Sequence, residues 1–173
     1  MLSSNIAMNQ KSCGMATMKE ATKDFLAQRN IAVVGVSRDP KRTANFIYRK
    51  LRSLGYTLFA VNPNATIVEG DVCYPDLKTI PVKPDGVVII TKPEITNQVV
   101  KQCAELGIAR VWMHKGIDSK VASVSEEAVN FCRKHNIVTI PGGCPMMYCR
   151  NADIGHRFFR WMHGVTGKLP GEI

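Results

Sequence analysis

Short apolar runs alternate along the chain with longer segments in which apolar residues recur every three or four positions. The runs are rich in valine and isoleucine, which is typical of strands buried on both faces of a parallel sheet. We expect strands at residues 31–36, 56–61, 86–91, 110–113 and 137–140. The pattern therefore predicts a protein in which strands and helices alternate.

The intervening segments have the spacing of amphipathic helices. We expect helices at residues 19–28, 39–54, 94–106 and 121–135. In the second of these, Asp39 is expected to cap the first turn, with Pro40 inside that turn and Gly55 behind the last one. Gly107 and Asn136 are expected to end the third and fourth helices in the same way.

Together these elements predict an α/β fold, namely a Rossmann-like, doubly wound parallel sheet of about five strands in a three-layer α/β/α arrangement. The first strand–helix–strand unit spans residues 31–61, close to the roughly 30 residues of a mononucleotide-binding unit. We expect residues 1–17 to form a loose N-terminal tail and residues 18–150 to form the domain. Residues 151–173 are expected to form a helical tail packed on the domain or on a twin subunit.

The composition adds a strong positive charge to this picture. The 173 residues hold 23 Lys and Arg against 14 Asp and Glu, a formal net charge of +9, and 45% of them are hydrophobic. This composition excludes disordered and collagen-like chains, and no apolar run approaches the roughly 20 residues of a membrane-spanning helix. The charge favours an anionic partner, such as a phosphorylated small molecule or a nucleic acid.

The cysteines and the basic C-terminal stretch narrow the class further. The six cysteines include no Cys-x-x-Cys pair, which argues against a zinc ribbon or a thioredoxin-like centre. We interpret them as reduced thiols and expect a cytoplasmic protein without a metal site. Residues 155–163 are both basic and aromatic, which is typical of nucleic-acid or membrane-surface binding, but their apolar members have helical spacing. Packing on the domain or on the twin subunit of a homodimer is therefore favoured over both.

Ligands of such sheets bind beyond the carboxyl ends of the strands. The loops expected there are residues 37–42, 62–64, 91–93, 114–116 and 141–145. The first of them opens a helix, where free backbone N–H groups and the helix dipole favour an anion. Ser37 adds a hydroxyl, and six basic residues lie between positions 37 and 52. Asp39 is an objection to a phosphate there, unless it faces its own helix as a cap.

The first loop lacks the dinucleotide fingerprint Gly-x-Gly-x-x-Gly, because Gly35 stands alone. A nicotinamide-adenine site also needs an acidic residue at the end of the second strand, to bind the ribose hydroxyls. Asn62 and Pro63 occupy that place. Both departures argue against NAD, and the P-loop pattern is absent as well.

Five stretches, in order and each near a strand end, resemble a known family. They are Ala-Val-Val-Gly-Val-Ser-Arg-Asp-Pro (32–40), Gly-Tyr-x-x-x-x-Val-Asn-Pro (55–63), Cys-Tyr-Pro (73–75), Val-Trp-Met-His-Lys-Gly (111–116) and Gly-Cys-Pro (143–145). The chain resembles the small standalone CoA-binding Rossmann domains, relatives of the CoA-binding domain of the succinyl-CoA synthetase alpha subunit. The resemblance covers residues 30–149 and implies coenzyme A, or an acyl-CoA, as the small-molecule ligand.

The resemblance also implies a role for each loop. The Ser37–Arg38 loop would hold the diphosphate at the start of the first helix after strand 1, and Thr91, Lys92 and Pro93 would flank the adenine. The residues implied in CoA binding are Val36, Ser37, Arg38, Lys41, Arg42, Asn62, Pro63, Thr91, Lys92, Pro93, His114, Lys115, Gly116 and Cys144. Asn62 and Pro63 would border the adenosine, with Lys41 or Arg42 near the 3′-phosphate. Lys115 and Gly116 would line the path of the pantetheine.

No residue of the chain is expected to catalyse a reaction alone. The phosphorylated histidine of the ligase lies in a later domain, which the short segment after residue 150 does not match. For Cys144 we prefer a small buried thiol over a redox partner of the CoA thiol, and for His114 a ligand contact or a structural role over a base. The alternatives are an NADP-dependent oxidoreductase and an accessory subunit of a CoA-transferring enzyme.

Overall fold

The structure, a computed structural model, describes residues 17–116 and 122–149. The tails expected at residues 1–17 and 151–173 lie outside these residues, apart from Thr17, which caps the first helix. The strands are β1 (Asn30–Val34), β2 (Thr57–Val61), β3 (Ile67–Val68), β4 (Asp71–Tyr74), β5 (Gly86–Ile89), β6 (Arg110–Met113) and β7 (Val138–Pro141). The helices are α1 (Met18–Leu26), α2 (Thr43–Ser53), α3 (Pro93–Glu105) and α4 (Glu126–Lys134), with short 3-10 helices η1 (Leu77–Thr79) and η2 (Pro145–Met147).

The strands form one seven-stranded sheet in the order β3-β4-β2-β1-β5-β6-β7. Every neighbouring pair is parallel except β3–β4, which is an antiparallel hairpin at one edge. The sheet confirms the predicted Rossmann-like α/β fold. The five predicted strands are all present, and β3 and β4 are two short strands that the sequence pattern did not predict.

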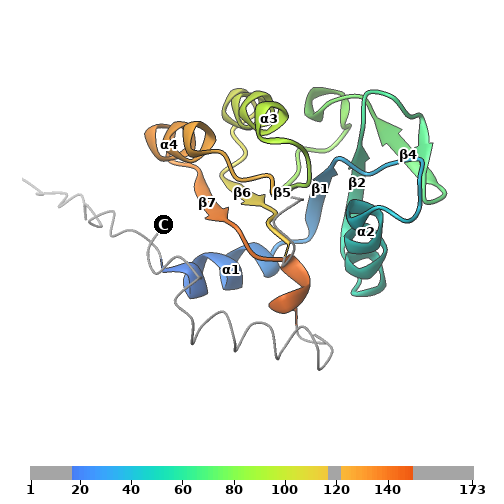
Figure 1. Ribbon diagram of the computed structural model, residues 1–173, viewed down its shortest axis with the longest axis horizontal. Helices are drawn as coiled ribbons and strands as arrows, with labels where there is room; N and C mark the ends of the chain where they lie inside the picture. The colour runs from blue at the N-terminus through green and yellow to red at the C-terminus, as the bar shows by residue number, and fades with distance from the viewer. Residues whose placement is uncertain (1–16, 117–121, 150–173) are drawn as a thin grey trace, which may run out of the picture.

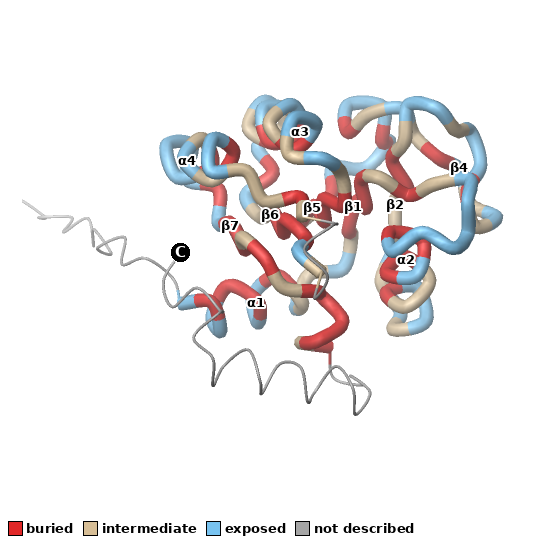
Figure 2. The backbone as a smooth tube through the Cα atoms, viewed as in Figure 1, coloured by how far each residue is buried: buried red, intermediate tan, exposed pale blue. Residues whose placement is uncertain are grey.

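Helices cover both faces of the sheet, so the three-layer arrangement is also confirmed. In Figure 1, α3 and α4 lie above the sheet and α1 and α2 lie below it. Alternate strand residues face opposite layers, because side chains alternate along a strand. Ile31 and Val33 pack with α1, α2 and η2, whereas Ala32 and Val34 pack with α3, α4 and η1. Figure 2 shows the resulting band of buried residues along the strands.

Helix α1 closes the lower layer against β6. The ring of Phe25 meets Trp112 edge-on at 5.4 Å between centroids, and the Asp24 carboxylate accepts a hydrogen bond of 2.6 Å from the Arg110 guanidinium. Trp112 is fully buried, and its indole N–H donates to the carbonyls of Gly142 and Gly143. Burial of this tryptophan therefore anchors both α1 and the loop after β7.

The predicted starts of two helices are wrong. Helix α2 begins at Thr43 with Arg42 as its N-cap, because the Asp39 carboxylate instead accepts a hydrogen bond of 3.0 Å from the Lys41 backbone N–H. Asp39 thus closes a turn ahead of the helix. Helix α4 begins at Glu126, where the Ser125 hydroxyl accepts from the backbone N–H of Ala128.

The β3–β4 hairpin turns through Glu69 and Gly70, whose φ angles are 53° and 83°. Two consecutive positive φ angles are typical of the tight type I′ turn. One face of the hairpin is bound to α2: the Tyr48 hydroxyl donates to the Asp71 carboxylate at 2.8 Å, and Arg52 pairs with the same carboxylate at 2.7 Å. Within residues 17–116 and 122–149, no helix is long and apolar enough to cross a membrane.

Candidate functional site

Because the six strands other than β3 run in the same direction, the loops after β1, β2, β5, β6 and β7 meet at one edge of the sheet. The residues singled out from the sequence all follow these strands or open the helix behind the first loop. The structure divides them into two groups. Those from 36 to 63 gather around the ends of β1 and β2, and those from 91 to 144 gather around the ends of β5, β6 and β7.

The loop after β1 is wedged between its neighbours. Gly35 has a φ of +102°, and a Cβ added there would lie 2.2 Å from the carbonyl oxygen of Ile90. The Gly35 N–H donates to the Val61 carbonyl at 3.0 Å. Val36 is fully buried, so its side chain belongs to the core and only its backbone faces the loops. Only glycine lets the loop approach the end of β5 this closely.

The start of α2 is open to an anion. Its N-cap residue, Arg42, provides no side-chain hydrogen bond to the first turn. The first backbone N–H groups of a helix have no partner within the helix, and the dipole makes this end positive. The Ser37 N–H is not one of these free groups, because it donates to the side chain of Asn45 at 2.9 Å.

The basic residues around this loop fall into two classes. Arg49 pairs with Glu69 at 2.6 Å and Arg52 pairs with Asp71, so the hairpin neutralises the side of α2 behind the loop. Arg42 contacts Asp39 at 3.4 Å with both side chains exposed. Arg38 and Lys41 are exposed and form no ion pair with any residue in the described part of the chain. These two cations remain available to a ligand.

Two hollows lie beside the loop, and Arg38 lines both. The smaller, of about 210 Å³, lies between the loop and the hairpin and is lined by Ser37, Arg38, Pro40, Asn45, Ile67, Val68 and Glu69. The larger, of about 460 Å³, lies beyond the ends of β2 and β4 and is lined by Arg38, Pro63, Asn64, Ala65, Thr66, Ile67, Cys73 and Pro75. The hairpin residues among these were not singled out from the sequence. The one feature of the sequence that could have indicated the hairpin is the Glu69–Gly70 pair at its turn.

Asn62 shapes the loop after β2. Its side-chain amide donates to the Val36 carbonyl at 2.7 Å, and its side-chain oxygen accepts from the Asn64 N–H at 2.9 Å. An acidic side chain there could not donate to Val36. Asn62 therefore joins the ends of β1 and β2, while Pro63 is the member of this pair that lines a hollow.

Hydrogen bonds donated by backbone N–H groups connect the loops of the second group. The Thr91 N–H donates to the Ser123 hydroxyl at 3.0 Å, and the Lys115 N–H donates to the Gly143 carbonyl at 3.3 Å. Lys92 is the exposed N-cap of α3, and Pro93 is its first residue. Gly116 is the last residue described before position 122.

His114 and Cys144 are buried in this group. His114 is only 1% exposed, and its Nδ1 has no hydrogen-bond partner among residues 17–116 and 122–149. Burial lowers the pKa of His114 to about 4, so the imidazole is neutral near pH 7. Burial also raises the pKa of the Cys144 thiol to about 11. The arrangement agrees with a buried, unreactive thiol, and no described group of three or more His, Cys, Asp or Glu could hold a metal ion.

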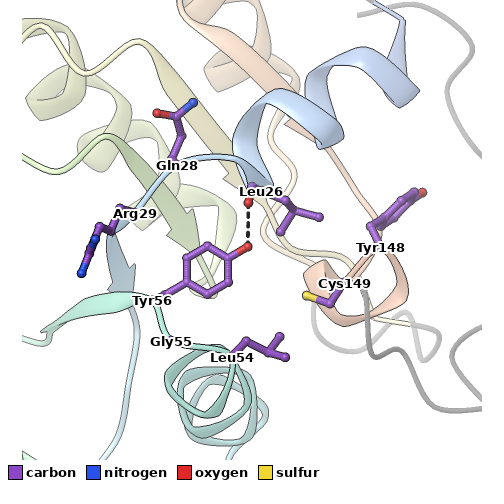
Figure 3. Close-up of a pocket in the computed structure, with 8 residues that line it drawn as sticks. All are labelled: Leu26, Gln28, Arg29, Leu54, Gly55, Tyr56, Tyr148 and Cys149. Atoms are coloured by element: carbon purple, nitrogen blue, oxygen red, sulfur yellow. Dashed lines mark hydrogen bonds between the residues drawn. The ribbon is translucent and has the colours of Figure 1, made fainter.

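A larger hollow, of about 930 Å³, lies at the opposite edge of the sheet, before β1 and β2. Figure 3 shows its lining: Leu26, Gln28, Arg29, Leu54, Gly55, Tyr56, Tyr148 and Cys149. The Tyr56 hydroxyl donates to the Leu26 carbonyl at 2.8 Å within it. None of the residues that the resemblance implies in CoA binding lines this hollow. In such sheets the ligand site lies at the carboxyl ends of the strands, and this hollow lies at their amino ends.

Comparisons with known proteins identify relatives of this chain. A family model described as "CoA binding domain" matches residues 29–150. Acetate–CoA ligase [ADP-forming] I of Archaeoglobus fulgidus is 25% identical over 120 residues, which are 66% of this chain and 17% of the ligase. The alpha subunit of acetate–CoA ligase [ADP-forming] II of Pyrococcus furiosus is 31% identical over 88 residues, 50% of this chain and 19% of that subunit.

Among solved structures, a hypothetical protein from Pyrococcus horikoshii OT3 is similar with a TM-score of 0.68 and 29% identity, covering 74% of this chain and 87% of that one. The chain thus spans less than a fifth of the two ligases. It matches nearly the whole of the small Pyrococcus protein. The expected resemblance to the CoA-binding part of succinyl-CoA synthetase-like enzymes is confirmed.

Proposed function

The chain belongs to the CoA-binding domain family, and from this membership we propose that it binds coenzyme A or an acyl-CoA without catalysing a reaction alone. The observation that carries the proposal is the uncapped start of α2, which opens beside a loop carrying the unpaired cations Arg38 and Lys41. A diphosphate fits this end because backbone N–H groups, the helix dipole and both cations favour negative charge.

The remaining parts of CoA follow the loops along the sheet edge. The adenosine would border Pro63 in the larger hollow, near the backbone that Asn62 holds, with Lys41 or Arg42 close to the 3′-phosphate. Thr91, Lys92 and Pro93 would flank the adenine. The pantetheine would run toward His114, Lys115 and Gly116, and its thiol end toward Cys144. The junction between the two groups is short, because Gly35 contacts the Ile90–Thr91 turn directly.

Two features support a role without catalysis. Catalysis of acyl transfer needs a nucleophile with a lowered pKa or a base near neutral pH. The pKa of His114 is far below that range and the pKa of the Cys144 thiol is far above it.

The test is calorimetric titration of the full chain with CoA, dephospho-CoA and NADP. We expect saturable binding of CoA, weaker binding of dephospho-CoA and no saturable heat from NADP. Arg38→Ala should weaken CoA binding about tenfold, the effect of one charge-assisted contact, while leaving the urea midpoint within error. Arg133→Ala is the matched control, because Arg133 is exposed at the far end of α4.

Binding of NADP but not CoA would overturn the proposal in favour of an oxidoreductase. Equal losses of affinity and stability in Arg38→Ala would overturn the assignment of the loop.

A second candidate is an accessory subunit of a CoA-transferring enzyme. The match to less than a fifth of two ADP-forming ligases favours it, because the remainder of those enzymes has no counterpart among residues 29–150. Alone, the chain should form no acetyl-CoA from acetate, CoA and ATP. Acetyl-CoA formation by the isolated chain would contradict both candidates.

A further inference from the structure

The conformation of the Ser37–Arg38 loop depends on a side chain outside it. Asn45, in the first turns of α2, is 1% exposed and forms two hydrogen bonds with one residue of the loop. Its side-chain oxygen accepts from the Ser37 N–H at 2.9 Å, and its side-chain amide donates to the Ser37 carbonyl at 2.7 Å. This is the pattern by which one strand pairs with another, supplied here by a side chain.

The hairpin fixes the orientation of this amide. The Asn45 amide also donates to the Glu69 carboxylate at 2.8 Å, and Arg49 donates to the same carboxylate oxygen at 2.6 Å. Because a carboxylate only accepts, the Asn45 nitrogen must face Glu69 and Ser37's carbonyl, and its oxygen must face the Ser37 N–H. Glu69 is itself held in the left-handed region, at a φ of 53°, by the hairpin turn.

From this geometry we infer that Asn45 is a positioning residue, which holds the Ser37–Arg38 loop in the shape that receives the ligand diphosphate, with Glu69 setting its orientation. The inference rests on the proposed function and extends it to the hairpin. Asn45 and Glu69 both line the smaller hollow with Arg38. A shift of the Ser37 backbone would therefore displace the neighbouring cation.

We call the Asn45 side chain, with its hydrogen bonds to Ser37 and Glu69, the clamp. The test replaces the amide donor of this clamp with an acceptor. In Asn45→Asp, one carboxylate oxygen would face the Ser37 carbonyl and the Glu69 carboxylate, with no proton for either at neutral pH. Two carboxylates so close raise each other's affinity for a proton. Acidification should therefore restore one of the lost hydrogen bonds.

Several other ionisable groups surround the clamp. Arg49 faces Glu69 from α2, and Arg52 donates to the Glu69 backbone carbonyl at 2.9 Å and to Asp71. Tyr48 donates to Asp71 from the same helix. The loop contributes Arg38, Asp39 and Lys41. Since CoA itself titrates, the readout is the ratio of variant to wild-type dissociation constants at each pH.

We expect Asn45→Asp to weaken CoA binding about thirtyfold near pH 8 and only about threefold near pH 5.5. The double variant Asn45→Asp/Glu69→Gln should show a smaller loss near pH 8 than Asn45→Asp alone, since the Gln amide can donate to Asp. Glu69→Gln alone should weaken CoA binding less than Asn45→Asp does near pH 8, because its carbonyl still accepts from Asn45 but no longer carries the charge that pairs with Arg49.

Asn97→Asp is the matched control. Asn97 also donates to a glutamate, at 2.6 Å to Glu127, and accepts from the Ser125 hydroxyl, but it lies on α3 away from the loop. It should leave the affinity ratio near one at both pH values. A pH-independent loss in Asn45→Asp, or none, would overturn the inference.

Asn45→Ala provides a second route should the aspartate variant not fold. It should weaken CoA binding about tenfold at every pH, because an uncharged methyl group loses the hydrogen bonds without adding a carboxylate. Unchanged affinity in this variant would refute the positioning role.

Hydrogen exchange at the Ser37 amide separates the two possible failures. If the wild-type protein does not bind CoA, the proposed function fails, and exchange still tests the clamp. Faster exchange of this amide in Asn45→Ala than in the wild type supports the clamp. Equal exchange overturns it.

Discussion

Substituting Gly35 by alanine tests whether the close approach of the first loop to β5 determines the site. The φ of +102° is unfavourable for an L-residue, which costs about 1–2 kcal/mol. The new Cβ would also lie 2.2 Å from the Ile90 carbonyl oxygen and 2.9 Å from its carbon. Both contacts are with backbone, so the end of β5 must move, at a further cost of about 1–3 kcal/mol.

Gly55→Ala separates the two contributions. Gly55 has a φ of +88°, but a Cβ added there would meet nothing within 4 Å. It carries the conformational cost without the steric one. The free energy of unfolding should therefore fall by about 1 kcal/mol in Gly55→Ala and by about 3 kcal/mol or more in Gly35→Ala.

The assay is urea denaturation of both variants, followed by circular dichroism. With a slope of about 2 kcal/mol per M, a difference of about 2 kcal/mol separates the two midpoints by about 1 M. CoA affinity should fall in Gly35→Ala alone. Equal midpoints, or a CoA affinity lost to the same degree in Gly55→Ala, would refute the argument that the contact with Ile90 shapes the site.

Two further predictions concern buried groups. Burial lowers the pKa of His114 from 6.5 to about 4, so on acidification the unfolded chain takes up this proton at a higher pH than the folded protein does. The contribution of His114 to the free energy of unfolding should therefore be fully present above about pH 6.5 and fall by about 3 kcal/mol as the pH drops to 4. In urea titrations across this range His114→Gln should flatten the loss, and an equally steep loss would count against the buried neutral imidazole. Since burial raises the pKa of Cys144 to about 11, its alkylation by iodoacetamide near pH 8, followed by peptide mass spectrometry, should proceed only as fast as the protein unfolds. Rapid labelling of the folded protein would contradict this.

The main elements of the sheet were predictable because each strand carries a continuous apolar run. Residues 110–113 coincide with β6, and the other four predicted strands differ from the observed ones only at their ends. The β3–β4 hairpin was missed for the opposite reason. Ile67 and Val72 pair across it but are 66% and 63% exposed, and only Val68 and Cys73 are buried, so strands this short leave no repeating apolar pattern.

The location of the site was predictable, and the hydrogen bonds within it were not. Parallel strands bring their carboxyl ends to one edge, whatever the details of the loops. The partner of the Ser37 N–H is different, because Asn45 follows it by eight residues and acts only once α2 and the hairpin are in place. Likewise, the sequence around Asp39 does not show whether its carboxylate caps the first turn of the helix or closes a turn ahead of the helix.

The distribution of unpaired positive charge in the folded chain also differs from the one that the sequence suggests. Six basic residues between positions 37 and 52 suggest one large anion-binding patch. The hairpin carboxylates of Glu69 and Asp71 pair with Arg49 and Arg52 on the helix behind the loop. This leaves Arg38 and Lys41 as the unpaired cations nearest the start of α2 in the described part of the chain. The same hairpin that fixes the shape of the loop through Asn45 thus also neutralises the two arginines on the helix behind it, so shape and charge at this site depend on one element.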